Sequence, residues 1–280
     1  MVLGFVQGQR HSDADRLMVS LASARDLREA RSLPFCYFCG EGFAAGKKAT
    51  RDHVPPKGVF AVEHRRPLIL PAHSHCNKSH QGHDQHMAQV IGLRREYVPS
   101  NPQHRLLKVH LFERPGEGGR LAAIETIDIG AAVWGWVRGF HAALYREFLP
   151  RQNRRAVELP FPEVEQLENG EATAKPVREQ RAVFVEIIKM NRAAGHVDQL
   201  ISNAGTVRYE CVWGEVVPGL WRCAFALDVY DWRDLGPPEM GQRGCVGIYE
   251  ADHRPVGATQ STGRTDVTYS NDDPLDPFGN

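Results

Sequence analysis

Residues 36–60, CYFCGEGFAAGKKATRDHVPPKGVF, place a pair of cysteines a short distance ahead of an Asp-His dipeptide. The cysteines, Cys36 and Cys39, are separated by two residues, and thiols with that spacing in a tight turn can both bind one zinc ion. Zinc in structural sites prefers four sulfur or nitrogen ligands, so this pair supplies only half of a shell. The other half must come from elsewhere in the chain.

The stretch RPLILPAHSHCNKSHQGHDQH, residues 66–86, supplies a second pair. His73 and Cys76 repeat the two-residue gap, and His75 is an alternative ligand to His73. We favour His73 because a ligand three positions before Cys76 keeps the geometry of the first pair. A closed four-ligand site leaves no position for substrate, so the ion would be structural. The expected ligands of this structural Zn²⁺ are Cys36, Cys39, His73 and Cys76.

Closing the zinc shell would bring distant residues together. We expect a strand that carries Asp52 and His53, a return strand near 67–71, and a helix from Cys76 to about Tyr97, which make a β-β-α unit. Neighbouring strand residues face opposite ways, so the Asp and the His do not easily bind the same ion. One of them would bind an ion, and the other would act on substrate. The start of the helix would carry three polar residues toward this dipeptide, namely Asn77, His80 and His83.

We call the two ligand pairs, Cys36 with Cys39 and His73 with Cys76, the first and second knuckle. Two knuckles with Asp-His between them, and an Asn directly after the last cysteine, resemble the HNH endonucleases, the ββα-metal nucleases with an accompanying zinc site. The resemblance covers residues 34–97. It implies that His53 is the general base, that Asp52 and Asn77 bind a catalytic divalent ion such as Mg²⁺, and that His80 assists or binds phosphate. The chain departs from the family in two ways. A His opens the second knuckle where a Cys is usual, and the Asn that orients the loop holding the base is absent. A backbone carbonyl could replace that Asn.

The residue types suit phosphodiester hydrolysis. Histidine titrates near neutral pH and can take a proton from water, and oxygen ligands suit a hard divalent ion. The chain has 34 Lys plus Arg and 34 Asp plus Glu, so its overall charge does not indicate a polyanionic partner. Between Lys47 and Arg95, however, nine basic residues face three acidic ones, an excess of six positive charges. Within this segment, Arg51, Lys57 and Lys78 are either phosphate contacts or solvated surface charges.

We therefore expect a metal-dependent endonuclease that acts on nucleic acid, with DNA favoured as the substrate. The main alternative is a non-catalytic zinc module that binds nucleic acid or protein. A third class is an interaction protein whose function lies in residues 100–255. No apolar run approaches the roughly 20 residues of a membrane span, and the start of the chain lacks a secretion signal. We expect a cytoplasmic protein with no membrane partner, and we leave open whether it is a homo-oligomer.

The expected fold class is α+β, in four segments. They are an N-terminal helical segment over 1–33 with a helix from 13 to 33, an HNH nuclease domain over 34–98, an accessory α+β region over 99–254, and a disordered acidic tail over 255–280. In the accessory region we expect a β-hairpin over 105–130, an apolar helix over 131–150, a loop or linker over 151–174, a helix over 177–195, and strands over 206–217, 221–230 and 244–249.

Several residues of the accessory region are expected to be structural. The aromatic stripe of the apolar helix has the spacing of a core face, and His141 on that stripe is expected to be a core histidine with a hydrogen-bond partner. Three dispersed cysteines lie in apolar surroundings. They are expected to be buried free thiols, namely Cys211, Cys223 and Cys245.

Overall fold

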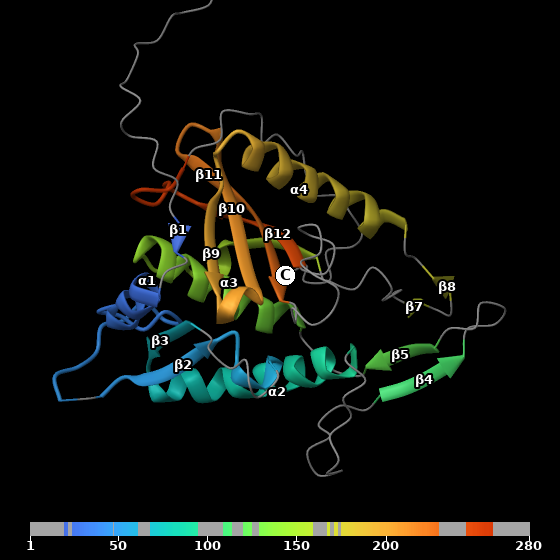
Figure 1. Cartoon of the computed structure of the whole chain (residues 1–280), viewed down its shortest axis with the longest axis horizontal. Coiled ribbons are helices and arrows are strands. Elements are labelled where there is room, and N and C mark those ends of the chain that lie inside the picture. Colours follow the sequence, from blue (N-terminus) through green and yellow to red (C-terminus); the bar gives the residue numbers. More distant parts are fainter. Residues whose placement is uncertain are drawn as a thin grey trace, which may run out of the picture.

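Figure 1 shows the computed structural model of the chain. It describes residues 20–21, 24–46, 48–60, 68–94, 109–113, 120–124, 129–158, 167–168, 171–172, 175–229 and 245–259. Helices and antiparallel sheets are both present, which confirms the α+β class. Within these residues, no helix is both long enough and apolar enough to cross a membrane.

The cysteine-histidine segment folds as two strands followed by a helix. β2 (Thr50–Val54) and β3 (Leu68–Ala72) pair antiparallel, and a single residue, His73, separates β3 from α2 (Ser74–Arg94). From Asp52 onward β2 alternates between buried and less buried residues, as expected for a half-buried strand, and Val54 and Leu70 are fully buried. The chain therefore follows the order of elements expected from the sequence.

The largest sheet in the described residues has six strands in the order β1-β9-β10-β11-β12-β6. Only β1 pairs with its neighbour in parallel, and the other pairings are antiparallel. The strands span β1 (Ser20–Leu21), β9 (Asp198–Ser202), β10 (Val207–Val217), β11 (Leu220–Val229), β12 (Cys245–Ala251) and β6 (Arg154–Glu158). The three strands predicted in the second half of the chain are thus confirmed as β10, β11 and β12.

Helix α3 (Ile129–Tyr145) lies between the large sheet and the β2-β3-α2 unit. On the side of the sheet, the ring of Phe140 stacks on that of Tyr209, with 5.2 Å between centroids. On the other side, Gly139 packs so closely that a Cβ atom there would lie 2.9 Å from Cγ1 of Val54. Because both sides of α3 are covered, apolar side chains around most of the helix are shielded from water.

The second face of the sheet is covered by α4 (Lys175–Ala193), as Figure 1 shows. Alternate residues of β10 divide between the two faces, since Trp213 belongs to the buried cluster that contains α3, and Val212 to the cluster that contains Phe184 and Ile188 of α4. The cluster around α3 also includes the apolar residues of β2 and β3. One core therefore runs from the β2-β3-α2 unit into the large sheet.

His141 and the three dispersed cysteines lie in the core as expected. His141 is buried, and its Nδ1 lies 3.1 Å from the hydroxyl oxygen of Tyr249, so it is a core histidine with a partner. The three dispersed cysteines are also buried and form no disulfide, which confirms that expectation. They are Cys211, Cys223 and Cys245.

The remaining elements are short. The predicted hairpin is confirmed as an antiparallel pair of strands. These elements are α1 (Ala24–Glu29), η2 (Ala30–Ser32), η3 (Lys57–Val59), β4 (Val109–Glu113), β5 (Arg120–Ile124), η6 (Arg151–Asn153), β7 (Leu167–Glu168), β8 (Glu171–Ala172) and η7 (Asn203–Gly205).

Three expectations about secondary structure were wrong. The N-terminal helix was expected from residue 13, but Ser20–Leu21 pairs with β9, and helix is found only over 24–32; residues 13–19 lie outside the described residues. The loop or linker over 151–174 contains β6, β7 and β8. The apolar helix ends at Tyr145 and does not continue to 150. For β1 and β6, pairing with distant strands overrides the local pattern, which is weak for short edge strands, whereas β7 and β8 pair with each other.

The start of the expected disordered tail is packed against the core. The backbone N–H and the hydroxyl of Thr259 donate to the buried carboxylate of Asp198, at 2.9 and 2.6 Å. Ala258 is buried as well. The expectation of disorder is therefore wrong for residues 255–259, and residues 260–280 lie outside the described residues.

Candidate functional site

Four side chains converge where the first knuckle meets the start of α2. Their potential ligand atoms all lie within 4.8 Å of one another. A tetrahedral zinc site with Zn–S bonds of 2.3 Å would have sulfur atoms about 3.8 Å apart, so the cluster has the right size for such an ion. The cluster could hold a metal ion such as zinc, and it consists of the four expected residues Cys36, Cys39, His73 and Cys76.

The local backbone explains why the first pair forms a knuckle. The N–H of Gly40 donates to the carbonyl of Cys36 at 2.8 Å, and the N–H of Cys36 donates to Glu41 at 2.9 Å. Gly40 has φ +79°, and a Cβ atom there would lie 2.7 Å from the ring of Phe148. Both the left-handed backbone and the close contact require glycine at this position.

The second pair is joined to the first by contacts at sulfur. Nδ1 of His73 lies 3.3 Å from Sγ of Cys39, and the backbone N–H of His73 donates to Sγ of Cys36 at 3.3 Å. His75 is exposed, and its Nε2 lies 3.3 Å from Sγ of Cys76. The structure therefore favours His73 over His75 as the fourth member of the cluster.

The electrostatics of the cluster suit a bound cation. Burial and, to a smaller extent, the neighbouring thiols of Cys36 and Cys39 together raise the pKa of Cys76 to about 12. A metal ion would offset the repulsion between thiolates, because a coordinating thiol is deprotonated outright. The donor set therefore fits zinc.

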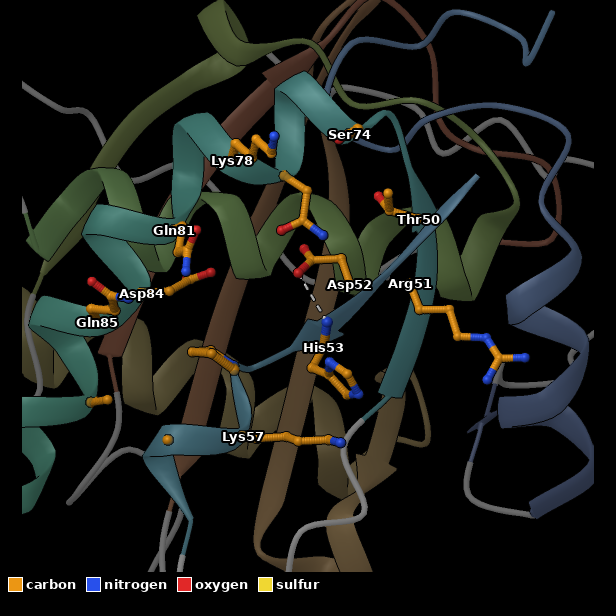
Figure 2. Close-up of a pocket in the computed structure, with 14 residues that line it drawn as sticks. Thr50, Arg51, Asp52, His53, Lys57, Ser74, Lys78, Gln81, Asp84 and Gln85 are labelled. Atoms are coloured by element: carbon orange, nitrogen blue, oxygen red, sulfur yellow. Dashed lines mark hydrogen bonds between the residues drawn. The ribbon is translucent and has the colours of Figure 1, made fainter. Parts of the chain in front are cut away.

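Asp52 and His53 present their side chains on different sides of β2, as Figure 2 shows. The carboxylate of Asp52 is 7% exposed, and it accepts hydrogen bonds on both oxygens. The hydroxyl of Tyr37 donates to Oδ2, and the backbone N–H of His53 donates to Oδ1 at 3.0 Å. Burial raises the pKa of Asp52, and these two hydrogen bonds act in the opposite direction.

The imidazole of His53 is half-buried in a positively charged environment. Burial lowers its pKa from the ordinary value of 6.5, and the positive charges of Lys57, Arg31 and Arg51 lower it further. All of these causes disfavour the imidazolium form. His53 is therefore neutral at neutral pH and able to accept a proton.

Asp52 and His53 both line a cavity of about 430 Å³ between β2, η3 and α2. The helix contributes residues that recur every three or four positions and so share one face. This periodicity brings Asn77 to the same cavity as Asp52 and His53. The lining residues are Thr50, Arg51, Asp52, His53, Pro56, Lys57, Gly58, Ser74, Asn77, Lys78, Gln81, Asp84, Gln85 and Ala88.

The three basic residues expected to contact phosphate also line this cavity. Arg51, Lys57 and Lys78 are exposed and come from three different elements, and Figure 2 shows their side chains around the opening. Their roles in binding stay predictions. What the structure adds is that they surround the same space as the Asp-His dipeptide.

His80 is not among the residues that line the cavity. Its ring stacks on Phe38 with 4.0 Å between centroids, and its Nδ1 would lie 3.5 Å from a Cβ atom at Gly135 of α3. Burial lowers the pKa of His80 to about 4. His80 thus packs between the knuckle and α3 rather than in the cavity lining, and its expected role at the phosphate stays a prediction. His83 is not a lining residue either, and its ring lies 6.0 Å from that of His80.

Sequence reasoning missed several residues of the site. Figure 2 shows Gln81 and Asp84 on the cavity side of α2, and Asp84 accepts a hydrogen bond from Nε1 of Trp136 at 3.1 Å. Burial, with a smaller contribution from the charge of Asp52, raises the pKa of Asp84 to about 7. The helical period starting from Asn77 could have identified Gln81 and Asp84. No sequence signal could have identified Tyr37, which lies fifteen residues before Asp52.

Comparison with known proteins identifies no family: no protein-family model, curated protein or solved structure matches this chain. The chemistry of the site is therefore inferred from the side chains around the cavity and from their charges. The observation on which this inference depends is that Asp52, His53 and Asn77 share one cavity beside the Cys₃His cluster.

Proposed function

We propose that this protein is a metal-dependent endonuclease of the HNH, or ββα-metal, kind, which hydrolyses phosphodiester bonds in nucleic acid, with DNA as the favoured substrate. The observation that carries the proposal is the common cavity of Asp52, His53 and Asn77 in a strand-strand-helix unit. The Cys₃His cluster would hold a structural zinc ion that fixes the first knuckle to the start of α2.

In this proposal His53 is the general base. A neutral imidazole can accept a proton from the water that attacks phosphorus, and the basic surroundings of His53 maintain the neutral form. The same positive charges would attract the phosphate to the ring. The cavity would therefore combine a neutral base with a site for an anion.

Asp52 and Asn77 would hold the catalytic divalent ion through oxygen atoms, the ligand type that Mg²⁺ and similar hard ions prefer. The fit rests on the carboxylate of Asp52: each of its oxygens accepts one hydrogen bond and has a second lone pair available. When bound, such an ion supplies Lewis-acid stabilisation of the negative charge that develops on the phosphate and the leaving oxygen.

Arg51, Lys57 and Lys78 would contact phosphates on either side of the scissile bond. All three are exposed and line the cavity, so their charges can reach a nucleic-acid backbone without being desolvated. Such contacts position the substrate and carry no sequence information. They also predict that binding weakens as the salt concentration rises.

The proposal is tested by incubating the purified protein with plasmid and with single-stranded DNA, in Mg²⁺, in Mn²⁺ or in EDTA. Cleavage should require the divalent ion and should be lost in His53→Ala, while DNA binding and folding are retained. His86→Ala is a matched control, because His86 is also half-buried but does not line the cavity. A non-catalytic zinc module would bind nucleic acid and show no cleavage in any of these conditions, which would refute the proposal.

A further inference from the structure

The hydroxyl of Tyr37 connects the Cys₃His cluster to the carboxylate of Asp52. Tyr37 lies between the two cysteines of the first knuckle, and only 1% of it is exposed. Its hydroxyl donates a hydrogen bond to Oδ2 of Asp52, which is buried as well. The cluster and the cavity are thus joined by one side chain.

This contact restricts the orientation of the carboxylate. Oδ2 is held by Tyr37 and Oδ1 by the backbone N–H of His53, so the plane of the Asp52 carboxylate is determined at both oxygens. The hydrogen bonds that ligating carboxylates accept from neighbouring groups orient them, and the loss of such a partner typically weakens metal binding by about 10- to 100-fold. A residue in the position of Tyr37 is therefore able to tune a metal ligand without touching the metal.

The position of the hydroxyl depends on the knuckle. The backbone on either side of Tyr37 is closed into a turn by the hydrogen bonds of Cys36 to Glu41 and of Gly40 to Cys36. Cys36 and Cys39, which flank Tyr37 and Phe38, both belong to the cluster. A metal ion in the cluster would fix this turn at two points, and with it the ring of Tyr37.

We propose that Tyr37 is a positioning residue that sets the affinity of Asp52 for the catalytic divalent ion, and that the metal in the Cys₃His cluster influences the reaction centre through this hydrogen bond. The inference rests on the proposed function, because it assigns Asp52 to a divalent ion. It adds a role for the cluster beyond holding two loops together.

The test compares Mn²⁺ binding by the full-length, zinc-loaded protein and its variants, measured by the electron paramagnetic resonance signal of free Mn²⁺. Tyr37→Phe should keep its zinc and bind Mn²⁺ about 10- to 100-fold more weakly than the wild type. Tyr249→Phe is the matched control, since it also removes a buried hydroxyl that has a partner, and it should bind Mn²⁺ normally. Asp52→Ala identifies the site and should lose most of the binding.

A second measurement uses the wild-type protein and does not depend on the folding of a variant. In a Mg²⁺ titration followed by NMR, the amide signals of Tyr37 and Phe38 should shift together with those of Asp52 and His53. Fixed signals at the knuckle, or unchanged Mn²⁺ affinity in Tyr37→Phe while Asp52→Ala is impaired, would overturn the role of Tyr37 and leave the nuclease proposal intact. A wild-type protein that binds no Mn²⁺ would overturn both.

Discussion

The indole N–H of Trp136 donates a hydrogen bond to Oδ1 of Asp84 at 3.1 Å. Trp136 belongs to α3, which also packs on the large sheet, and Asp84 belongs to the face of α2 that lines the cavity. The accessory region, residues 99–254, therefore holds a carboxylate in the wall of the candidate site and contributes to the shape of that site.

Replacing Asp84 with Asn should change how stability depends on pH. Burial raises the pKa of Asp84 from 3.8 to about 7, so in this pH range the folded state keeps a proton that the unfolded state releases. The contribution of Asp84 to stability is thus present below pH 3.8 and is lost as the pH rises through about 7. Urea unfolding without added divalent ions should show a decline of at most about 1.4 kcal/mol per pH unit that Asp84→Asn lacks. Parallel stability profiles for the two proteins would contradict this.

The pH profile of cleavage should report the surroundings of His53. Its pKa is lowered by burial and by Lys57, Arg31 and Arg51, so the acidic limb of the rate profile should have its midpoint below 6.5. Lys57→Gln removes one of these charges and should move the midpoint toward higher pH. Lys48→Gln, an exposed change outside the cavity lining, should leave it in place. The ring C–H signals of His53 give the same pKa without cleavage.

Zinc content should depend on the cluster and on no other cysteine tested. Purified protein should contain one zinc ion per chain, and Cys76→Ser should lose it together with much of the protein's stability, since metal binding is coupled to folding. Cys245→Ser changes a buried thiol of the sheet, outside the cluster, and should retain the ion. Elemental analysis after gel filtration measures both. Equal zinc content in the two variants would contradict the assignment of zinc to the Cys₃His cluster.

Arg138 should be essential for the position of the first knuckle. Its buried guanidinium donates to the carbonyl of Phe38 in the knuckle and to that of Leu149 at 2.8 Å. Arg138→Met would leave two buried carbonyls unpaired, and it should lower the free energy of unfolding by about 3 kcal/mol. It should also speed the release of zinc to a chelator. Arg146→Met, at an exposed position after α3, should do neither.

Two glycines of α3 should respond in opposite directions to replacement by alanine. At Gly135 the new Cβ would lie 3.5 Å from its nearest neighbour, an ordinary contact, so the helix should gain up to about 1 kcal/mol of stability. At Gly139 it would lie 2.9 Å from Val54, so α3 must move away from β2 at a cost of about 1 to 3 kcal/mol. Thermal unfolding of the two variants measures the difference. A stabilised Gly139→Ala would show that this contact yields easily.

Short-range patterns in the sequence were enough to predict part of the molecule. The spacing of the cysteines and of His73 identified the cluster, because two residues is the separation at which one turn presents two ligands. The strand-strand-helix order and strands β10 to β12 followed from alternation and from the helical period. Such patterns are local, so they survive in the folded protein wherever tertiary contacts agree with them.

Long-range packing decided the rest. β1 and β6 are strands because they pair with distant residues, and neither has a strong pattern of its own. His80 packs against α3 and Phe38 rather than lining the cavity because α3 covers that side of α2, which the sequence of α2 alone does not reveal.

The sequence by itself determined which residues can bind metal and which can accept a proton, because those capacities belong to the side chains. Only the tertiary structure determined that Tyr37 holds Asp52 and that Trp136 holds Asp84. Hydrogen bonds of this kind join segments whose distance along the chain carries no periodic signal. They exist only once the core around α3 has brought the segments together.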